Sequence, residues 1–244
     1  MKLSRSDGDA AAALREVGCV LLQPNELAAR CQLQLAELAE MAPTWNRLPR
    51  DEYLRDGGRY RFRRHSCFIY EGGHLRQVPH RAHWQPTEYN ALHGGMERWF
   101  EPITAEVVQA PVWTRLLSGV SELFASARPV ARWYIEAHQF RIDTAEGIGR
   151  PTPEGAHRDG VDYVAVILVN RCNIRGGETR VFEAEGISGV RFTMREPWSA
   201  LLLDDARVIH ETTPIQADGP GGVRDTLVLT FREHGFQAPD ASSR

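Results

Sequence analysis

The sequence contains a single lysine, Lys2, so that nearly all of its positive charge is carried by arginine. Its 29 basic residues are balanced by 32 acidic residues, and the formal net charge is −3. A protein that binds the phosphate backbone of nucleic acid needs an excess of basic charge on its binding face. The composition therefore gives no support for nucleic acid as a partner. Because arginine is the default cation here, a single arginine is only weak evidence for function.

Cysteine is scarce as well, and no Cys-x-x-Cys pair occurs among Cys19, Cys31, Cys67 and Cys172. Paired cysteines are typical of zinc sites and redox motifs, and dense disulfide frameworks are typical of small secreted proteins. No apolar run is long enough to span a membrane, and the charged N-terminal segment lacks the apolar core of a signal peptide. We therefore expect a reduced, cytoplasmic setting without export or membrane insertion.

Length and composition predict one globular domain. The chain has 244 residues, of which 42% are hydrophobic and 25% are charged, and all-β barrels of this size often form a single unit. We expect the domain to span residues 1–236, with a barrel core at 131–233 and helices at 8–41 and 94–126 flanking it. Residues 237–244 are expected to be a disordered tail.

Apolar and alternating patterns predict the elements of this domain. In residues 26–41 apolar side chains recur at intervals of three and four, which predicts one amphipathic helix. Residues 162–170 and 198–205 are runs suited to buried strands. The predicted helices are 8–17, 26–41, 94–109 and 111–125, and the predicted strands are 19–22, 60–70, 132–142, 162–170, 178–182, 198–205 and 226–231. The helices are expected to pack on the outside of a sheet.

The segment around His157 and Asp159 is a candidate metal site. These residues are two apart, so on an extended backbone their side chains leave on one face and can share one ion, with His210 as the third ligand. Two imidazoles and one carboxylate leave one side of an octahedral ion open, as in non-haem Fe(II) enzymes. A structural zinc site would have four closed ligands, and no cysteine lies nearby in sequence. The alternative is two surface polar residues beside a turn.

Arg224 and Thr226 stand at the head of an apolar strand, beyond His210. A buried arginine is costly unless an anion meets it, and the planar guanidinium suits a carboxylate held by two hydrogen bonds. The hydroxyl of Thr226, two residues further on, can donate to the same group. The pair therefore predicts a carboxylate-binding site on the strand that follows the third metal ligand.

Residues 43–93 are irregular and rich in arginine and histidine. Alternation places Arg59, Arg61 and Arg63 on one side of a predicted strand, where they can bind a substrate carboxylate if that side faces the metal. A solvated basic edge that prevents sheet pairing is the alternative. Five histidines occupy the same segment: His65, His74, His80, His83 and His93. Their spacings repeat no ligand pattern, which disfavours a second metal site.

The order His-x-Asp, Gly-Gly turn, distal histidine and Arg-x-Thr resembles the Fe(II)/2-oxoglutarate-dependent dioxygenases. Four segments look like the branch that contains bacterial L-isoleucine hydroxylases and biofilm-associated BsmA-like proteins. They are RYRFRR at 59–64, EAHQFRI at 136–142, PEGAHRDGV at 153–161 and NIRGGE at 173–178. The resemblance covers residues 45–235, about four-fifths of the chain.

This resemblance implies a mainly β fold with flanking helices, a double-stranded β-helix of the jelly-roll or cupin type. It implies Fe(II) on His157, Asp159 and His210, and 2-oxoglutarate bound through its distal carboxylate by Arg224 and Thr226. With O2 these would hydroxylate a free, aliphatic L-amino acid such as isoleucine, leucine or methionine, with release of succinate and CO2.

Residues 132–142 precede the metal motif and are expected to cross the pocket. Gln139 and Arg141 share one face of this strand, so Gln139 is a candidate for 2-oxoglutarate binding and Arg141 for substrate binding. His138, on the other face, is expected to be a satisfied core histidine. The loop at 143–153 contains two glycines and two prolines and is expected to act as a lid.

Two other function classes stay open. One is a BsmA-like binding or sensor protein of stress or biofilm signalling, which keeps the metal-binding barrel without turnover. The other is a cupin-type metal enzyme that works without 2-oxoglutarate, such as an isomerase, and it would leave Arg224 and Thr226 unexplained. The expected partner is a small-molecule substrate, and exposed sheet edges make a homodimer a further expectation.

Overall fold

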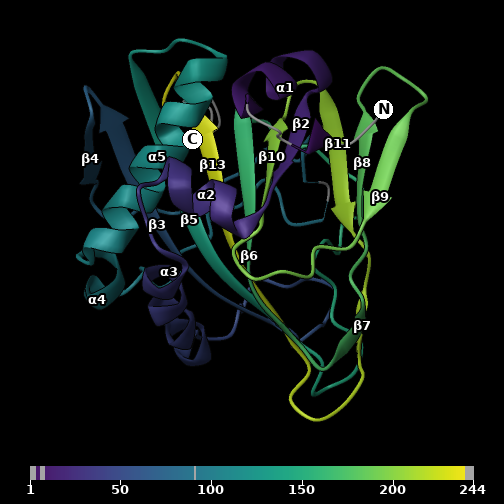
Figure 1. Ribbon diagram of the computed structural model, residues 1–244. Coiled ribbons are helices and arrows are strands. Elements are labelled where there is room, and N and C mark those ends of the chain that lie inside the picture. The colour runs from purple at the N-terminus through teal and green to yellow at the C-terminus, as the bar shows by residue number, and fades with distance from the viewer. Residues whose placement is uncertain (1–3, 6–8, 91, 240–244) are drawn as a thin grey trace.

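The computed structural model describes residues 4–5, 9–90 and 92–239, and one eight-stranded sheet forms its centre (Figure 1). In spatial order its strands are β1 (Ser4–Arg5), β2 (Cys19–Leu22), β10 (Ala200–Asp204), β6 (Tyr163–Cys172), β13 (Val223–Arg232), β5 (Arg132–Asp143), β3 (Arg61–Glu71) and β4 (His74–Gln77). All neighbours in this sheet are antiparallel except β1 and β2.

Two small sheets accompany the large one. The first contains β11 (Val208–Thr212), β8 (Thr179–Glu183) and β9 (Gly189–Phe192), and the second contains β12 (Ile215–Ala217) and β7 (Ile174–Gly176). Val181 and Val208 of the first small sheet pack in one apolar cluster with Val164, Leu168 and Leu201 of the large sheet. Two antiparallel layers with an apolar interface form the predicted jelly-roll, and the mainly β fold class is confirmed.

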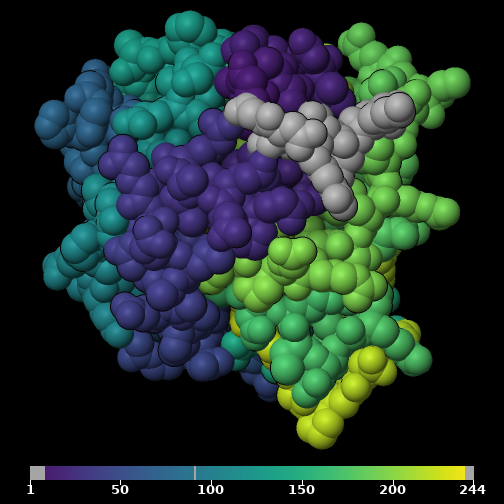
Figure 2. All heavy atoms as spheres, in the orientation of Figure 1, coloured from purple at the N-terminus to yellow at the C-terminus, as the bar shows by residue number. Residues whose placement is uncertain are grey.

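Helices cover the other face of the large sheet. They are α1 (Ala10–Val17), α2 (Pro24–Arg30), α3 (Leu35–Met41), the 3-10 helix η1 (Ala42–Arg47), α4 (Ala105–Val108) and α5 (Pro111–Ala127). Phe124 of α5 stacks on Tyr163 with ring centroids 4.6 Å apart and meets Phe231 at 4.8 Å. In Figure 2 the purple N-terminal helices form a continuous surface on this side. These helices cover one face of the large sheet and leave the opposite face to line a pocket.

Strand alternation decides which side chains reach that pocket. On β5, Trp133, Ile135 and Ala137 belong to the core beneath the helices, whereas His138 and Phe140 line the pocket on the other face. β13 runs antiparallel to β5 and alternates in the same way, with its pocket side chains at even positions. The even-numbered residues of both strands therefore form this wall of the pocket.

The single helix predicted over residues 26–41 is wrong, because the chain breaks between α2 and α3. Gln34 and Glu37 form a capping box that starts a new helix, and Gln32 has a positive φ of 53°. The break also brings Cys31 against α5, where a Cβ on Gly119 would lie 2.7 Å from the Cys31 sulfur. Glycine at 119 is therefore required by this close approach.

The helix predicted over residues 94–109 is also wrong for most of its length, since only Ala105–Val108 is helical. Arg98 instead pairs with His83, each backbone N–H donating to the other's carbonyl at 3.0 Å. The helix predicted at 111–125 is confirmed as α5. Pairing with a distant segment therefore overrode the local pattern between residues 94 and 104.

The ends of the described chain bear on two expectations. No helix among the described residues is long and apolar enough to cross a membrane. At the start of the expected tail, Gln237 is buried and donates from Nε2 to the carbonyls of Asp159 and Gly160 at 3.1 and 2.9 Å. Residues 240–244 of that tail lie outside the described residues.

Candidate functional site

His157, Asp159 and His210 converge in the structure. His157 precedes β6 and His210 lies on β11, and the backbone N–H of each donates to the carbonyl of the other at 3.1 and 2.9 Å. Asp159 places Oδ1 3.9 Å from Nε2 of His157 and Oδ2 3.7 Å from Nε2 of His210. The ligand atoms of the three residues all lie within 4.8 Å of one another. Two imidazoles and one carboxylate can therefore share one ion and leave its other side open.

The histidines of this triad are prepared to act as ligands. Nδ1 of His157 donates to the carbonyl of Gly155 at 2.9 Å, which leaves the Nε2 lone pair free for a metal. Burial, and then the neighbouring His157, lower the pKa of His210 to about 3, so its imidazole is neutral at pH 7. Burial also acts to lower the pKa of His157, but Asp159 and Glu154 outweigh it and the net shift is upward. A bound cation would compete with that proton.

Asp205 holds the loop that carries Asp159. Its carboxylate accepts the backbone N–H groups of Asp159, Gly160 and Val161 at 2.9, 2.8 and 3.1 Å. Asp205 is fully buried, and burial followed by the charge of Asp159 raises its pKa to about 7. Sequence reasoning missed this residue, although its place directly after a buried strand was a signal.

Gln85 contacts Asp159 from the opposite direction. Its Nε2 donates to Oδ1 of Asp159 at 3.2 Å, while its Oε1 accepts from Nη2 of Arg98 at 2.9 Å and Nδ2 of Asn90 at 3.2 Å. Arginine can only donate, so the orientation of the Gln85 amide is settled. Gln85 and Asn90 lie in the irregular 43–93 region, where the sequence carried no periodic signal, and Arg98 lies in the segment that was wrongly predicted to be helical.

The triad opens into a pocket of about 120 Å³ between the two layers of the barrel. Arg224 and Thr226 line the same pocket from β13. Arg224 is buried, and its Nη2 has no hydrogen-bond partner among the described residues. Burial, and then Arg171, lower the pKa of Arg224 to about 10. A buried guanidinium with a free donor is a ready site for a carboxylate.

The structure brings Arg61 and Arg63 to the pocket. Arg61 donates from Nε to Asp51 at 2.7 Å, and Arg63 has Nη1 3.7 Å from the same carboxylate oxygen. The Arg63 guanidinium lies over the ring of Phe100 at 3.7 Å and donates from Nη2 to Nδ1 of His138 at 2.7 Å. The side of β3 that carries these arginines is therefore interior rather than a solvated edge.

The structure does not bring Arg59, Gln139 or Arg141 to this pocket. Arg59 is largely exposed and lies 3.6 Å from Glu146. Arg141 donates from Nε and Nη2 to Asp225 at 2.7 and 2.8 Å, and Gln139 donates to Thr44 at 3.2 Å. Gln139, Arg141 and Asp225 occupy odd positions, which on β5 and β13 face the helices.

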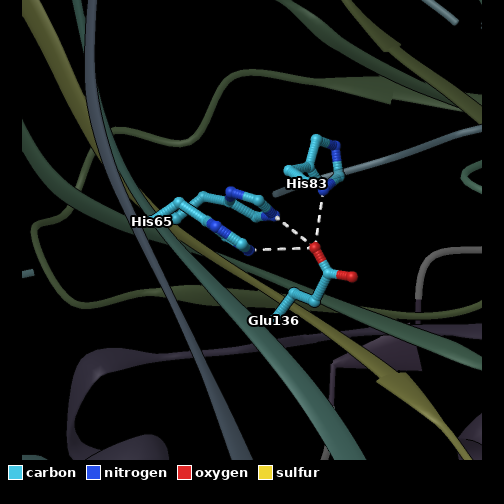
Figure 3. Close-up of side chains that lie close together, drawn as sticks. His65, His83 and Glu136 are labelled. Carbon is cyan, nitrogen blue, oxygen red and sulfur yellow. Dashed lines mark hydrogen bonds and ion pairs between the residues drawn. The ribbon is translucent and has the colours of Figure 1, made fainter. Parts of the chain in front are cut away.

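A second cluster of titratable groups lies beside the pocket. Nε2 of His65 and Nδ1 of His83 point toward the same oxygen of Glu136, at 3.0 and 2.6 Å (Figure 3). Nε2 of His138 is 3.9 Å from that oxygen. All four side chains are buried, and one ligand atom from each lies within 4.8 Å of the others. Two of the five histidines that crowd the sequence at 65–93 thus meet a carboxylate from β5.

Hydrogen-bond roles identify this cluster as a proton-satisfied network. Arg63 can only donate, so Nδ1 of His138 accepts and its Nε2 carries the proton that faces Glu136. That nitrogen has no lone pair for a metal. Burial lowers the pKa of His65, His83 and His138, so all three rings are neutral, and His65 and His83 donate to the Glu136 carboxylate. His138 is thus a satisfied buried histidine, as its sequence context predicted.

Comparison with known proteins places the chain in a family. Residues 42–230 match the family model described as 2OG-Fe dioxygenase. The structure is similar to the crystal structure of a bsmA homolog from Methylobium petroleophilum PM1, with 53% identity, a TM-score of 0.93, and coverage of 98% of this chain and 99% of that one. No curated protein sequence gives a significant match.

More distant solved structures share the fold. IDO from Bacillus thuringiensis is 18% identical, with a TM-score of 0.76 over 96% of this chain and 99% of that one. The Fe(II)/α-ketoglutarate-dependent dioxygenase TqaL is 17% identical, with a TM-score of 0.68 over 91% of this chain and 85% of that one. The family match implies Fe(II) as the metal, with 2-oxoglutarate and O2 as co-substrates. On this evidence, the chain belongs to the 2OG-Fe dioxygenase family.

Proposed function

We propose that this protein is an Fe(II)- and 2-oxoglutarate-dependent oxygenase that hydroxylates a free, aliphatic L-amino acid such as isoleucine, leucine or methionine. The proposal rests on one observation, which is that the candidate metal ligands and a carboxylate-binding arginine line the same pocket. The triad His157, Asp159 and His210 opens into the cavity that also holds the unpaired donor of Arg224. A metal with an open face beside a carboxylate site is what a 2-oxo acid needs in order to bind.

In this proposal the triad would hold Fe(II), and Arg224 with Thr226 would bind the distal carboxylate of 2-oxoglutarate. The bound iron, 2-oxoglutarate and O2 supply the hydroxylation chemistry, in which one oxygen atom enters the substrate C–H bond and the other enters succinate as CO2 is released. The protein binds the reactants, orients them and excludes water. The donor set fits the metal, because Nε2 of His157 presents its lone pair while Nδ1 is held by a carbonyl.

The pocket wall supports a small, partly aliphatic substrate. Phe140, Ile142, Val166 and Val228 supply apolar surface, and Arg61 supplies a cation. A cavity of about 120 Å³ is below the size typical of sites for drug-sized ligands, which favours a small substrate over a large molecule.

A second candidate is a BsmA-like binding or sensor protein without turnover. The 53% identity to a bsmA homolog supports this alternative. Three converging metal ligands and a buried Arg224 whose Nη2 has no partner among the described residues favour turnover, because a pure binding module has no need for an open metal face.

Succinate formation tests the proposal. Anaerobically purified protein would be given Fe(II), 2-oxoglutarate and air, with each of the twenty L-amino acids in turn and with Asp159→Ala as the control. We expect one or a few aliphatic amino acids to raise succinate production, with a matching gain of 16 mass units in the amino acid. Stable 2-oxoglutarate binding with no succinate under any condition would favour the sensor alternative.

A further inference from the structure

We propose that Glu154 binds the α-ammonium group of the substrate, while Arg61 and Arg98 bind its α-carboxylate. The pocket would thereby select a zwitterionic amino acid. This inference rests on the proposed function and assigns three side chains, two of which, Glu154 and Arg98, had no role in the sequence-based prediction.

Unpaired polar atoms mark both halves of this site. Oε2 of Glu154, Nη2 of Arg61 and Nε of Arg98 are buried without a partner in the described part of the chain, and all three side chains line the pocket. A buried polar atom left unpaired costs free energy, and a charged group costs more than a neutral one. The carboxylate of Glu154 and the guanidinium groups of Arg61 and Arg98 can therefore bind a ligand that carries both a positive and a negative charge.

Glu154 is suited to an ammonium group. Its side chain is 14% exposed, and Oε1 lies 3.5 Å from Nε2 of His157, which places the carboxylate beside the metal triad. The other oxygen is the one without a partner. No arginine forms an ion pair with Glu154 among residues 4–5, 9–90 and 92–239. The carboxylate therefore remains available to a cation that enters the pocket.

Arg61 and Arg98 are suited to a carboxylate. Arg61 uses Nε for Asp51 and Arg98 uses Nη2 for Gln85, so each keeps a free donor. Asp51 is shared with Arg63, which leaves these guanidiniums with an excess of positive charge. Burial and then the charge of Arg61 lower the pKa of Arg98 to about 10. An anion bound between the two cations would relieve that repulsion.

The two halves of the site lie in one cavity. Arg61, Arg98 and Glu154 line it together with His157 and Asp159 of the triad. The ammonium and carboxylate of an α-amino acid are attached to one carbon. A ligand of that kind therefore needs an anionic and a cationic group in the same small cavity, and Glu154 and the two arginines supply them.

Calorimetric titration separates the two halves. The probes are L-isoleucine, L-leucine and L-methionine, each paired with its deamino acid (3-methylpentanoate, 4-methylpentanoate and 4-(methylthio)butanoate). They are added anaerobically to protein loaded with Fe(II) and 2-oxoglutarate. We expect Glu154→Gln to weaken amino-acid binding by about 30-fold or more and to leave binding of the deamino acid unchanged. Arg98→Met and Arg61→Met should each weaken both members of a pair.

Controls keep the result interpretable. Glu146→Gln removes a carboxylate outside this pocket and should leave every affinity unchanged. Glu154→Asp keeps the charge but shortens the side chain by one methylene, so this variant should lose part of the preference for the amino acid. It replaces Glu154→Gln in the experiment if Glu154→Gln does not fold. Mn(II) affinity of Glu154→Gln should equal that of the wild type.

Three outcomes would overturn the inference. The first is an unchanged preference for the amino acid in Glu154→Gln and Glu154→Asp. The second is a fall of more than about tenfold in the Mn(II) affinity of Glu154→Gln, which would make Glu154 part of the metal site. The third is wild-type protein that binds no amino acid among the probes. In the last case succinate formation with another class of substrate would leave the oxygenase function intact. Absence of succinate from a wild type that binds the amino acids as expected would instead count against the proposed function alone.

Discussion

Gln85 donates from Nε2 to Oδ1 of Asp159 at 3.2 Å, and its own oxygen is held by Arg98 and Asn90. All three of these supporting residues are buried. A carboxylate with one oxygen engaged in this way presents the other, Oδ2, toward His210. The candidate ligand is thereby oriented before any metal binds, and one hydrogen-bond chain joins it through Gln85 to Arg98.

Replacement of Gln85 by leucine should therefore weaken metal binding. Partners that orient metal ligands typically contribute about 10- to 100-fold in affinity. We expect Gln85→Leu to lower Co(II) affinity by that amount in a calorimetric titration. Gln216→Leu, which changes an exposed glutamine on β12, is the matched control. Equal Co(II) affinities in the two variants would show that Gln85 does not orient Asp159.

Each residue of the triad should be needed for turnover. We expect His157→Ala, Asp159→Ala and His210→Ala to abolish succinate formation and to bind less than one equivalent of Fe(II), because two ligands cannot hold the geometry of the ion. Circular dichroism should show a retained fold, since the barrel core does not include these residues. Wild-type turnover in any one variant would remove that residue from the metal site.

Arg224 should select 2-oxoglutarate. Loss of one side of a buried charge pair costs about 3–5 kcal/mol, so Arg224→Ala should weaken 2-oxoglutarate binding by about 150- to 4,000-fold. Arg224→Lys should recover only part of this, because an ammonium cannot make the two-pronged contact. Thr226→Val removes one hydroxyl and should cost about tenfold. Titration of 2-oxoglutarate into the anaerobic Fe(II) protein measures all three, and unaltered affinity in Arg224→Ala would assign the co-substrate to another residue.

Arg141 should matter for stability and not for substrate binding. Asp225 is 1% exposed, and Arg141→Met leaves it without its guanidinium partner. We expect the free energy of unfolding in urea to fall by about 3–5 kcal/mol, with the substrate KM unchanged. A second change, Asp225→Leu, should restore most of the loss because it removes the unpaired charge. A raised KM with wild-type stability would return Arg141 to the substrate site that its sequence suggested.

The buried histidine cluster should make the fold sensitive to acid. Burial lowers the pKa of His83 from an ordinary value of 6.5 to about 3, so between these values the unfolded chain binds a proton that the folded protein does not. Stability is therefore fully present above pH 6.5 and is lost as the pH falls, by about 1.4 kcal/mol per unit from this group. His65 and His138 act in the same direction. Urea unfolding from pH 8 to 5 should show a shallower slope for His83→Gln, and parallel curves would contradict the assignment.

Local pattern was sufficient for several of these features. The spacing of two residues placed His157 and Asp159 together, and the same spacing placed Arg224 and Thr226 on one face of β13, where both line the pocket. Alternation follows from the geometry of a strand and needs no knowledge of the rest of the fold. The helix at α5 and the strand at β5 were likewise predicted because each pattern is long and regular.

Which face of a strand points inward is not a local property. The sequence divided β5 correctly into one face with Gln139 and Arg141 and another with Glu136 and His138. The pairing of β5 with β13 and the packing of α5 decide that the second face lines the pocket. The position of Arg141 just before the metal motif therefore predicted a role in substrate binding, whereas in the structure Arg141 pairs with Asp225 beneath the helices.

The sequence by itself determined the three candidate metal ligands and the arginine beyond them, because each depends on residue type and short spacing, and the class of fold followed from the family resemblance that these motifs carry. Only the tertiary structure decided the second layer of the site. Gln85 and Asp205 bond Asp159 from segments about 75 and 45 residues away in the chain, and Arg98 in turn holds Gln85. Such hydrogen bonds depend on the positions of loops that have no repeating apolar pattern in the sequence. Those positions are set by packing against the whole barrel.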